Sequence, residues 1–112
     1  MKKGDLGKSS TGMQPNLAAA LCYLLGFVSG LIFFLVEKEN KFVRFHAMQS
    51  IVTFGILFVV GVILPLIPFI GWALIPFLGL FNLILWIVLM VKAYQGERLK
   101  LPVAGDIAEK NI

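Results

Sequence analysis

The fold is decided by a run of 45 residues without Asp, Glu, Lys or Arg, AMQSIVTFGILFVVGVILPLIPFIGWALIPFLGLFNLILWIVLMV (Ala47–Val91). A membrane-spanning helix needs about 20 apolar residues, because each residue adds about 1.5 Å and the hydrocarbon layer is roughly 30 Å thick. The run is therefore long enough for two spans, predicted at 47–64 and 72–91. Two prolines and a glycine between them, in PLIPFIG (65–71), predict a turn. A re-entrant hairpin over 47–91 is the alternative.

A second charge-free run lies upstream, Leu17–Val36, and its 20 residues suffice for one span. The whole chain is 59% hydrophobic and 14% charged, against about 45–50% and about 25% in soluble domains. A soluble chain of this length leaves much of its surface in water and could not bury so much apolar material. The sequence predicts an all-α integral membrane protein with three transmembrane helices, the last two joined by a short Pro/Gly turn.

The charges divide the chain into three parts. We expect a disordered polar N-terminal tail (1–16), a helical transmembrane domain (17–94, with spans 17–36, 47–64 and 72–91) and a polar C-terminal tail (95–112). Seven Lys and Arg residues follow Val36, and three precede Leu17. Because cytoplasmic loops are enriched in Lys and Arg, this predicts a multi-pass protein of the cell membrane with its C-terminus in the cytoplasm and its N-terminus outside. The net charge of +4 is therefore explained by basic residues that orient the chain in a membrane, and the predicted partner is the lipid bilayer. Without aromatic residues interleaved among the basic ones, no nucleic-acid partner is predicted.

Small residues recur every four positions in the first predicted span, at Ala18, Cys22, Gly26 and Gly30. This spacing places them on one helix face, where another backbone can approach closely. We favour packing within the bundle over a dimer face. In the last span, Asn82 follows Gly79 by one turn. An amide in hydrocarbon needs a hydrogen-bonding partner, and a bond between helices is favoured over a solute site.

The charged connection ends in the motif Phe42-Val43-Arg44-Phe45-His46-Ala47-Met48-Gln49-Ser50. Its helical spacing puts four side chains on one face, those of Phe42, Phe45, His46 and Gln49. We interpret this segment as an interfacial turn that leads into the second span, with the rings at headgroup level and Arg44 extending to water. For His46, an anchoring role is favoured over a proton-sensitive switch.

No catalytic, cofactor-binding or metal-binding set is predicted. The chain has one histidine and one cysteine, and no acidic residue lies within a predicted span. A metal site needs about four ligands from such residues, and no glycine-rich phosphate loop occurs. The sequence therefore does not predict an enzyme.

The motif Phe42–Ser50 looks like the signature of a family of small bacterial and archaeal membrane proteins of unknown function, similar to the chloroplast inner-envelope import component Tic-twenty. Ala19–Leu24 resembles the first span of that family. Lys92–Glu97, followed by Leu101–Val103, resembles the exit from its last span. The resemblance covers roughly residues 16–105 and implies a helical membrane fold. It implies no established activity for the prokaryotic members, whereas the plastid relatives are associated with protein import and described with four spans.

These observations predict a small integral membrane protein whose sequence indicates no particular activity. We expect a non-enzymatic subunit or scaffold that acts through helix packing, with itself or another membrane protein as partner. The alternative is a channel, transporter or protein-translocation component. Because three helices enclose no pore, that role would require oligomerisation.

Overall fold

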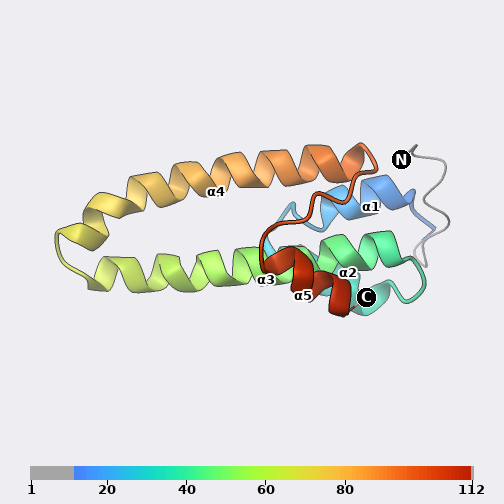
Figure 1. Ribbon diagram of the computed structural model, residues 1–112, viewed down its shortest axis with the longest axis horizontal. Helices are drawn as coiled ribbons and strands as arrows, with labels where there is room; N and C mark the ends of the chain where they lie inside the picture. Colours follow the sequence, from blue (N-terminus) through green and yellow to red (C-terminus); the bar gives the residue numbers. More distant parts are fainter. Residues whose placement is uncertain (1–11, 112) are drawn as a thin grey trace.

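The computed structural model describes residues 12–111, and all regular secondary structure in this range is helical. The predicted all-α class is confirmed. The helices are α1 (Pro15–Leu21), α2 (Phe27–Val36), α3 (Lys41–Ile63), the short 3-10 helix η2 (Leu64–Leu66), α4 (Ile70–Tyr94) and α5 (Ala104–Lys110). The antiparallel pair α3 and α4 forms a long hairpin, and α1, α2 and α5 gather around one half of it, away from η2 (Figure 1). The longest axis measures 49 Å.

The two long helices, α3 and α4, are each long and apolar enough to cross a bilayer. At about 1.5 Å per residue, their 23 and 25 residues extend roughly 35 Å or more. The side chain of Asn40 caps α3 by accepting a hydrogen bond from the backbone N–H of Val43, at 3.1 Å. Pro65 and Pro68 lie between α3 and α4, and Gly71 allows the turn to close. A Cβ atom there would collide with the carbonyl oxygen of Leu64.

The predicted first span, 17–36, differs from the structure. Two short helices, α1 and α2, replace a single long one, and the chain reverses direction between them at residues 22–26. The amide of Asn16 donates to the carbonyl of Tyr94 at 3.2 Å, so α1 begins beside the end of α4. The guanidinium of Arg44 donates to the carbonyl of Phe34 at 3.1 Å, so α2 ends beside the start of α3. The α1–α2 hairpin therefore enters and leaves at the same end of the molecule.

The described residues thus contain two long apolar helices where the sequence predicts three. Local interactions explain the reversal. Gly26 has a φ of 65°, which favours glycine over residues with a side chain. The hydroxyl of Ser50, on α3, donates to the carbonyls of Cys22 and Gly26 at 2.7 and 2.9 Å. Carbonyls that the interrupted helix leaves free are therefore satisfied from a neighbouring helix.

We call the end of the molecule that holds residues 37–40 and the end of α4 the charged end, and the end that holds η2 the apolar end (Figure 1). The core lies at the charged end, between α1, α3 and α4; its buried residues are Ala19, Tyr23, Phe42, Phe54, Leu89 and Ala93. The described part of the predicted polar tail (95–112), residues 95–111, runs back along the molecule, and α5 packs on α3. Most of the predicted disordered tail (1–16) lies outside the described residues, but Pro15 and Asn16 belong to α1.

Candidate functional site

A cluster of fully buried polar side chains lies at the charged end, centred on His46, Gln49 and Ser50 of α3. The Gln49 amide donates to the Tyr23 hydroxyl oxygen at 3.0 Å, and that hydroxyl lies 2.6 Å from Nδ1 of His46. Nε2 of His46 lies 2.9 Å from the carbonyl oxygen of Glu97. Because a carbonyl can only accept, Nε2 carries the hydrogen, and Nδ1 of the neutral ring accepts from Tyr23. Each polar atom in this series of hydrogen bonds has a partner.

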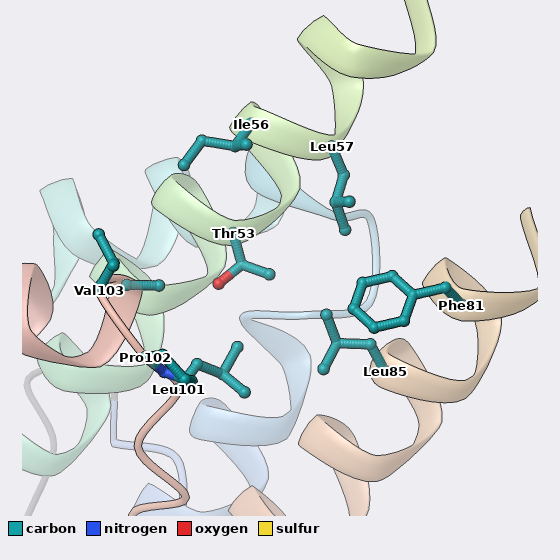
Figure 2. Close-up of a pocket in the computed structure, with 9 residues that line it drawn as sticks. Thr53, Ile56, Leu57, Phe81, Leu85, Leu101, Pro102 and Val103 are labelled. Carbon is teal, nitrogen blue, oxygen red and sulfur yellow. The ribbon is translucent and has the colours of Figure 1, made fainter. Parts of the chain in front are cut away.

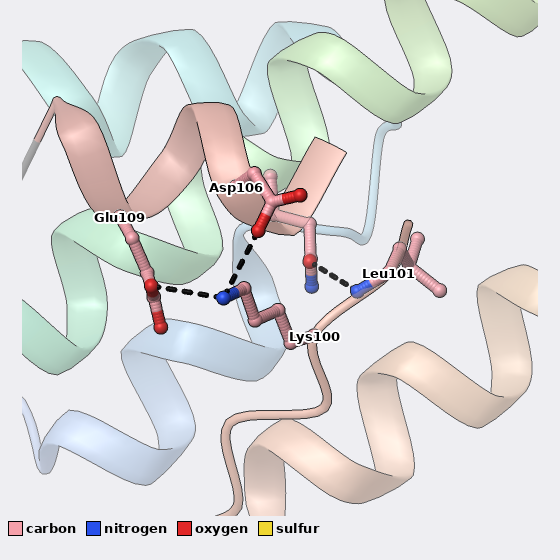
Figure 3. Close-up of polar contacts among 5 residues, drawn as sticks. Lys100, Leu101, Asp106 and Glu109 are labelled. Atoms are coloured by element: carbon pink, nitrogen blue, oxygen red, sulfur yellow. Dashed lines mark hydrogen bonds and ion pairs between the residues drawn. The ribbon is translucent and has the colours of Figure 1, made fainter. Parts of the chain in front are cut away.

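Gln49 also connects α3 to the segment that follows α4. Its amide nitrogen donates to the carbonyl of Leu99 at 2.8 Å. Its carbonyl oxygen accepts from the N–H of Leu101 at 3.0 Å, the bond drawn to Leu101 in Figure 3. With the bond from His46 to Glu97, three backbone groups of the tail are held by two side chains of α3. The cluster therefore fixes the path of residues 97–101, which in turn positions α5.

The reversal between α1 and α2 is held by the same cluster. Besides Ser50, the hydroxyl of Ser29 donates to the carbonyl of Cys22 at 2.9 Å. From α4, the indole N–H of Trp86 donates to the carbonyl of Tyr23 at 2.7 Å. Three helices thus supply donors to carbonyls of the reversal. These bonds fix the position along α3 and α4 at which the α1–α2 hairpin turns back.

The aromatic and basic residues of the motif differ from the interfacial anchors that the sequence predicts. Phe42 and Phe45 are buried within the chain, with 4% and 0% of their surface exposed. Arg44 extends over the ring of Phe34, 4.1 Å from its centroid, and donates to the carbonyl of Glu37 at 2.6 Å. Arg44 therefore joins the end of α2 to the start of α3, although sequence alone suggests that it extends to water.

The small residues of the predicted stripe lie against α3 of the same chain. Ala18 and Cys22 are buried in a cluster with Val43 and Ala47. At Gly30, an added Cβ atom would lie 2.8 Å from the carbonyl oxygen of Ala47 and 2.8 Å from Cβ of Ser50. Gly26 lies in the reversal, so the stripe is divided between two helices and does not form one continuous face.

Asn82 and Gly79 lie outside the buried cluster, Asn82 at the middle of α4 and Gly79 one turn nearer the apolar end. Both residues are exposed, and within residues 12–111 the amide of Asn82 makes no hydrogen bond. They border a cavity of about 380 Å³ just beyond the reversal, which Gly26, Phe54 and Trp86 also line. The structure therefore brings Asn82 close to Gly26 but gives it no bonding partner.

The tail carries a small surface network of charges. Nζ of Lys100 lies 3.0 Å from carboxylate oxygens of both Asp106 and Glu109 (Figure 3). Hydrogen bonds to Asp106 and then Glu109 raise the pKa of Lys100 above its ordinary value. Lys92 pairs with Glu97 at 3.1 Å. These exposed ion pairs connect residues of the tail to one another and to the end of α4, but they contribute little to stability.

Tyr23 and the carbonyls of Glu97 and Leu99 belong to the cluster, although the sequence did not predict them as parts of a site. The available signal is the spacing of His46, Gln49 and Ser50, which places three polar groups within one turn of an apolar helix. Among the described residues, no group of three or more His, Cys, Asp or Glu is placed to hold a metal ion.

Residues 12–108, most of the chain and all of the cluster, match one protein family, the magnetosome magnetite crystal formation protein family. The chain belongs to this family. It is 54% identical over 105 residues to a UPF0132 membrane protein of Methanocaldococcus jannaschii, with 94% of each chain covered. It is also 53% identical over 100 residues to a UPF0132 membrane protein of Archaeoglobus fulgidus, with 89% of this chain and 97% of the relative covered. No solved structure matches the chain.

These relatives are uncharacterised and named only as membrane proteins. Their names and the two long apolar helices together indicate that the chain is associated with a lipid bilayer. The comparisons therefore support the prediction that the chain belongs to a family of small membrane proteins without an established activity. The comparisons do not show a similarity to Tic-twenty.

Proposed function

We propose that the protein is a non-enzymatic membrane subunit or scaffold that acts through helix packing, with another membrane protein or a second copy of itself as partner. One observation carries the proposal. The face of α4 that packs in the core, with Trp86, Leu89 and Ala93, continues toward the apolar end as Gly79 and Asn82. These positions are spaced by three or four residues and so share a face. The α1–α2 hairpin reverses at residues 22–26 and does not cover this continuation.

The chemistry of the uncovered face supports a protein partner. In a bilayer, lipid chains cannot accept or donate hydrogen bonds, so an unpaired amide is unfavourable there. A second helix can supply a partner for Asn82, and such bonds contribute about 0.6–2 kcal/mol. Gly79 gives that helix room to approach. A helix seated here would extend the packing of α1 toward the apolar end.

The relatives add a second line of support. They are named as membrane proteins, and the family description concerns formation of a crystal in magnetosomes. A membrane-associated role without catalysis is consistent with that description. For this chain we propose only the packing role, because the buried polar side chains of the cluster bond to other groups of the same chain.

Photo-cross-linking of the full chain in its native membrane tests the proposal. Benzoylphenylalanine replaces Asn82, and in a control it replaces Ile84, which lies about 200° around the helix on the opposite, exposed face. We expect a discrete protein adduct from position 82 and a much weaker one from position 84, and the adduct's mass identifies the partner.

Gentle extraction followed by mass determination provides the second readout. A complex larger than one chain supports the packing role. If that complex contains only copies of this chain, flux assays in liposomes distinguish a packed oligomer from the channel or transporter alternative. A monomer, without protein adducts at position 82, contradicts the proposal.

A further inference from the structure

A second cavity lies between the two long helices and the tail. It has a volume of about 270 Å³. Thr53, Ile56 and Leu57 of α3 line one side, Phe81 and Leu85 of α4 another, and residues 101–104 of the tail the third (Figure 2). All of these residues except Thr53 have apolar side chains. The cavity is therefore suited to an apolar guest.

Thr53 gives the cavity a single polar group. Only 8% of its surface is exposed, and its hydroxyl oxygen is buried without a hydrogen-bonding partner. A threonine in a helix can donate to the carbonyl of the preceding turn, but the Thr53 hydroxyl instead points into the space toward Leu101 and Val103 (Figure 2). A buried hydroxyl without a partner is unfavourable, so an acceptor atom in this cavity would stabilise it.

The composition of the cavity distinguishes between possible guests. A buried water is held by two to four polar partners, and the side chains of this cavity offer one. Ligand pockets commonly measure about 300–1,000 Å³, so a volume of about 270 Å³ fits part of a single chain and excludes a whole two-chain lipid. An apolar chain with one oxygen at its end satisfies both the walls and Thr53.

The direction of the cavity matches that of a lipid in a leaflet. Along α3, Thr53 lies nearer the charged end than Leu57 does, and along α4, Leu85 lies nearer that end than Phe81 does. The hydroxyl is therefore at the end of the cavity that faces the charged connection. A membrane lipid likewise places its ester or ether oxygens toward the headgroups and its chains toward the bilayer centre.

We propose that this cavity binds one chain of a lipid of the surrounding bilayer, and that Thr53 donates a hydrogen bond to the ester or ether oxygen at the start of that chain. The tail residues 101–104 close the cavity, so the bound chain also helps to hold the tail against the two long helices. This inference is independent of the proposed packing partner, because the cavity lies between elements of one chain.

Lipid retention tests the proposal. The full chain is reconstituted with dioleoyl phosphatidylcholine, extracted in a mild detergent and measured by native mass spectrometry. We expect one retained lipid per chain for the wild type. Thr53→Val keeps the shape but lacks the hydroxyl and should reduce occupancy about fivefold, as expected for loss of one hydrogen bond. Thr53→Ser keeps the hydroxyl and should stay within about twofold of the wild type. Equal retention by the Val and Ser variants overturns the role of Thr53.

A photoreactive lipid tests the location independently of variant folding. Phosphatidylcholine with a diazirine in one acyl chain should label peptides that contain residues 53–57 and 81–85. Leu85→Phe, which narrows the cavity, should remove this label, while the label on other lipid-facing peptides of α4 should not change. Labelling of residues 53–57 and 81–85 that is unchanged in Leu85→Phe shows ordinary lipid contact only and overturns the proposal.

Discussion

At the scale of single residues, the polar side chains of Phe42–Ser50 connect parts of the chain that are far apart in sequence. Arg44 bonds to the end of α2, Gln49 to Tyr23 and the tail, and Ser50 to the reversal. Every described polar side chain from Arg44 to Ser50 thus bonds to another element. The motif acts as the point where α1, α2, α3 and the tail are joined.

Replacement of Gln49 tests this view. Gln49→Leu keeps a similar size but leaves the carbonyl of Leu99 and the N–H of Leu101 without partners. We expect the free energy of unfolding in detergent to fall by about 2–3 kcal/mol, because buried groups lose their bonds. Gln95→Leu, the same change at an exposed position, should stay within about 0.5 kcal/mol of the wild type. Equal effects of the two substitutions would contradict a structural role for Gln49.

Asn82 should respond differently, because its amide has no partner among the described residues. We expect Asn82→Leu to change the unfolding free energy of the isolated chain by less than about 0.5 kcal/mol. The same substitution should reduce the yield of the native complex obtained after gentle extraction. A large loss of stability in the isolated chain would instead indicate that Asn82 bonds within the monomer.

The partners of these residues explain what sequence could and could not predict. Helical spacing correctly places His46 and Gln49 on one face of a helix. Their partners include main-chain carbonyls of Glu97 and Leu99, about 50 positions away, and every residue type offers such a carbonyl. Sequence therefore indicates that these polar groups need partners but not which groups they are.

At the scale of elements, the turn between α3 and α4 and the reversal between α1 and α2 depend on different parts of the sequence. The turn between α3 and α4 lies where Pro65 and Pro68 predict it, because proline removes a backbone donor locally. The reversal between α1 and α2 depends on donors from Ser50 and Trp86, which are distant in sequence. The apolar run 17–36 would have the same composition whether it crossed a bilayer or turned back. Its length and composition therefore predicted a single span and could not reveal the reversal.

Gly30 tests how closely α2 and α3 must approach. In Gly30→Ala, the new methyl group would meet Ala47 and Ser50 at distances that require the helices to separate. We expect a loss of about 1–3 kcal/mol of stability and faster amide hydrogen exchange in α2. Gly55→Ala is the matched control, since a methyl group added there on α3 would have no atom of another element within 4 Å. This control should be neutral or stabilise the helix by up to about 1 kcal/mol. Indistinguishable results for the two variants would contradict the tight contact.

At the scale of the whole molecule, the α1–α2 hairpin differs from the topology that three spans would give. With three spans, the segment before α1 and the end of α4 would lie on opposite sides of a bilayer. In the structure, Asn16 bonds to the carbonyl of Tyr94, so these two segments share the charged end. The turn at the other end, residues 64–70, contains no charged residue. Lys38, Lys41, Arg44 and Lys92 lie at the charged end, an asymmetry of the kind that orients membrane proteins.

Cysteine accessibility in sealed vesicles distinguishes the two topologies. Single cysteines replace Gln14, Lys38, Phe69 and Lys110 in a Cys22→Ser background, and a membrane-impermeant maleimide is applied from one side at a time. A topology in which only α3 and α4 cross the bilayer, and the α1–α2 hairpin returns, predicts that positions 14, 38 and 110 react from the same side and that position 69 does not. Three spans instead predict that position 14 reacts from the side of position 69. Lys38 and Lys110 share a side in both topologies and so control for vesicle orientation, which leaves position 14 to decide whether α1 and α2 cross or return.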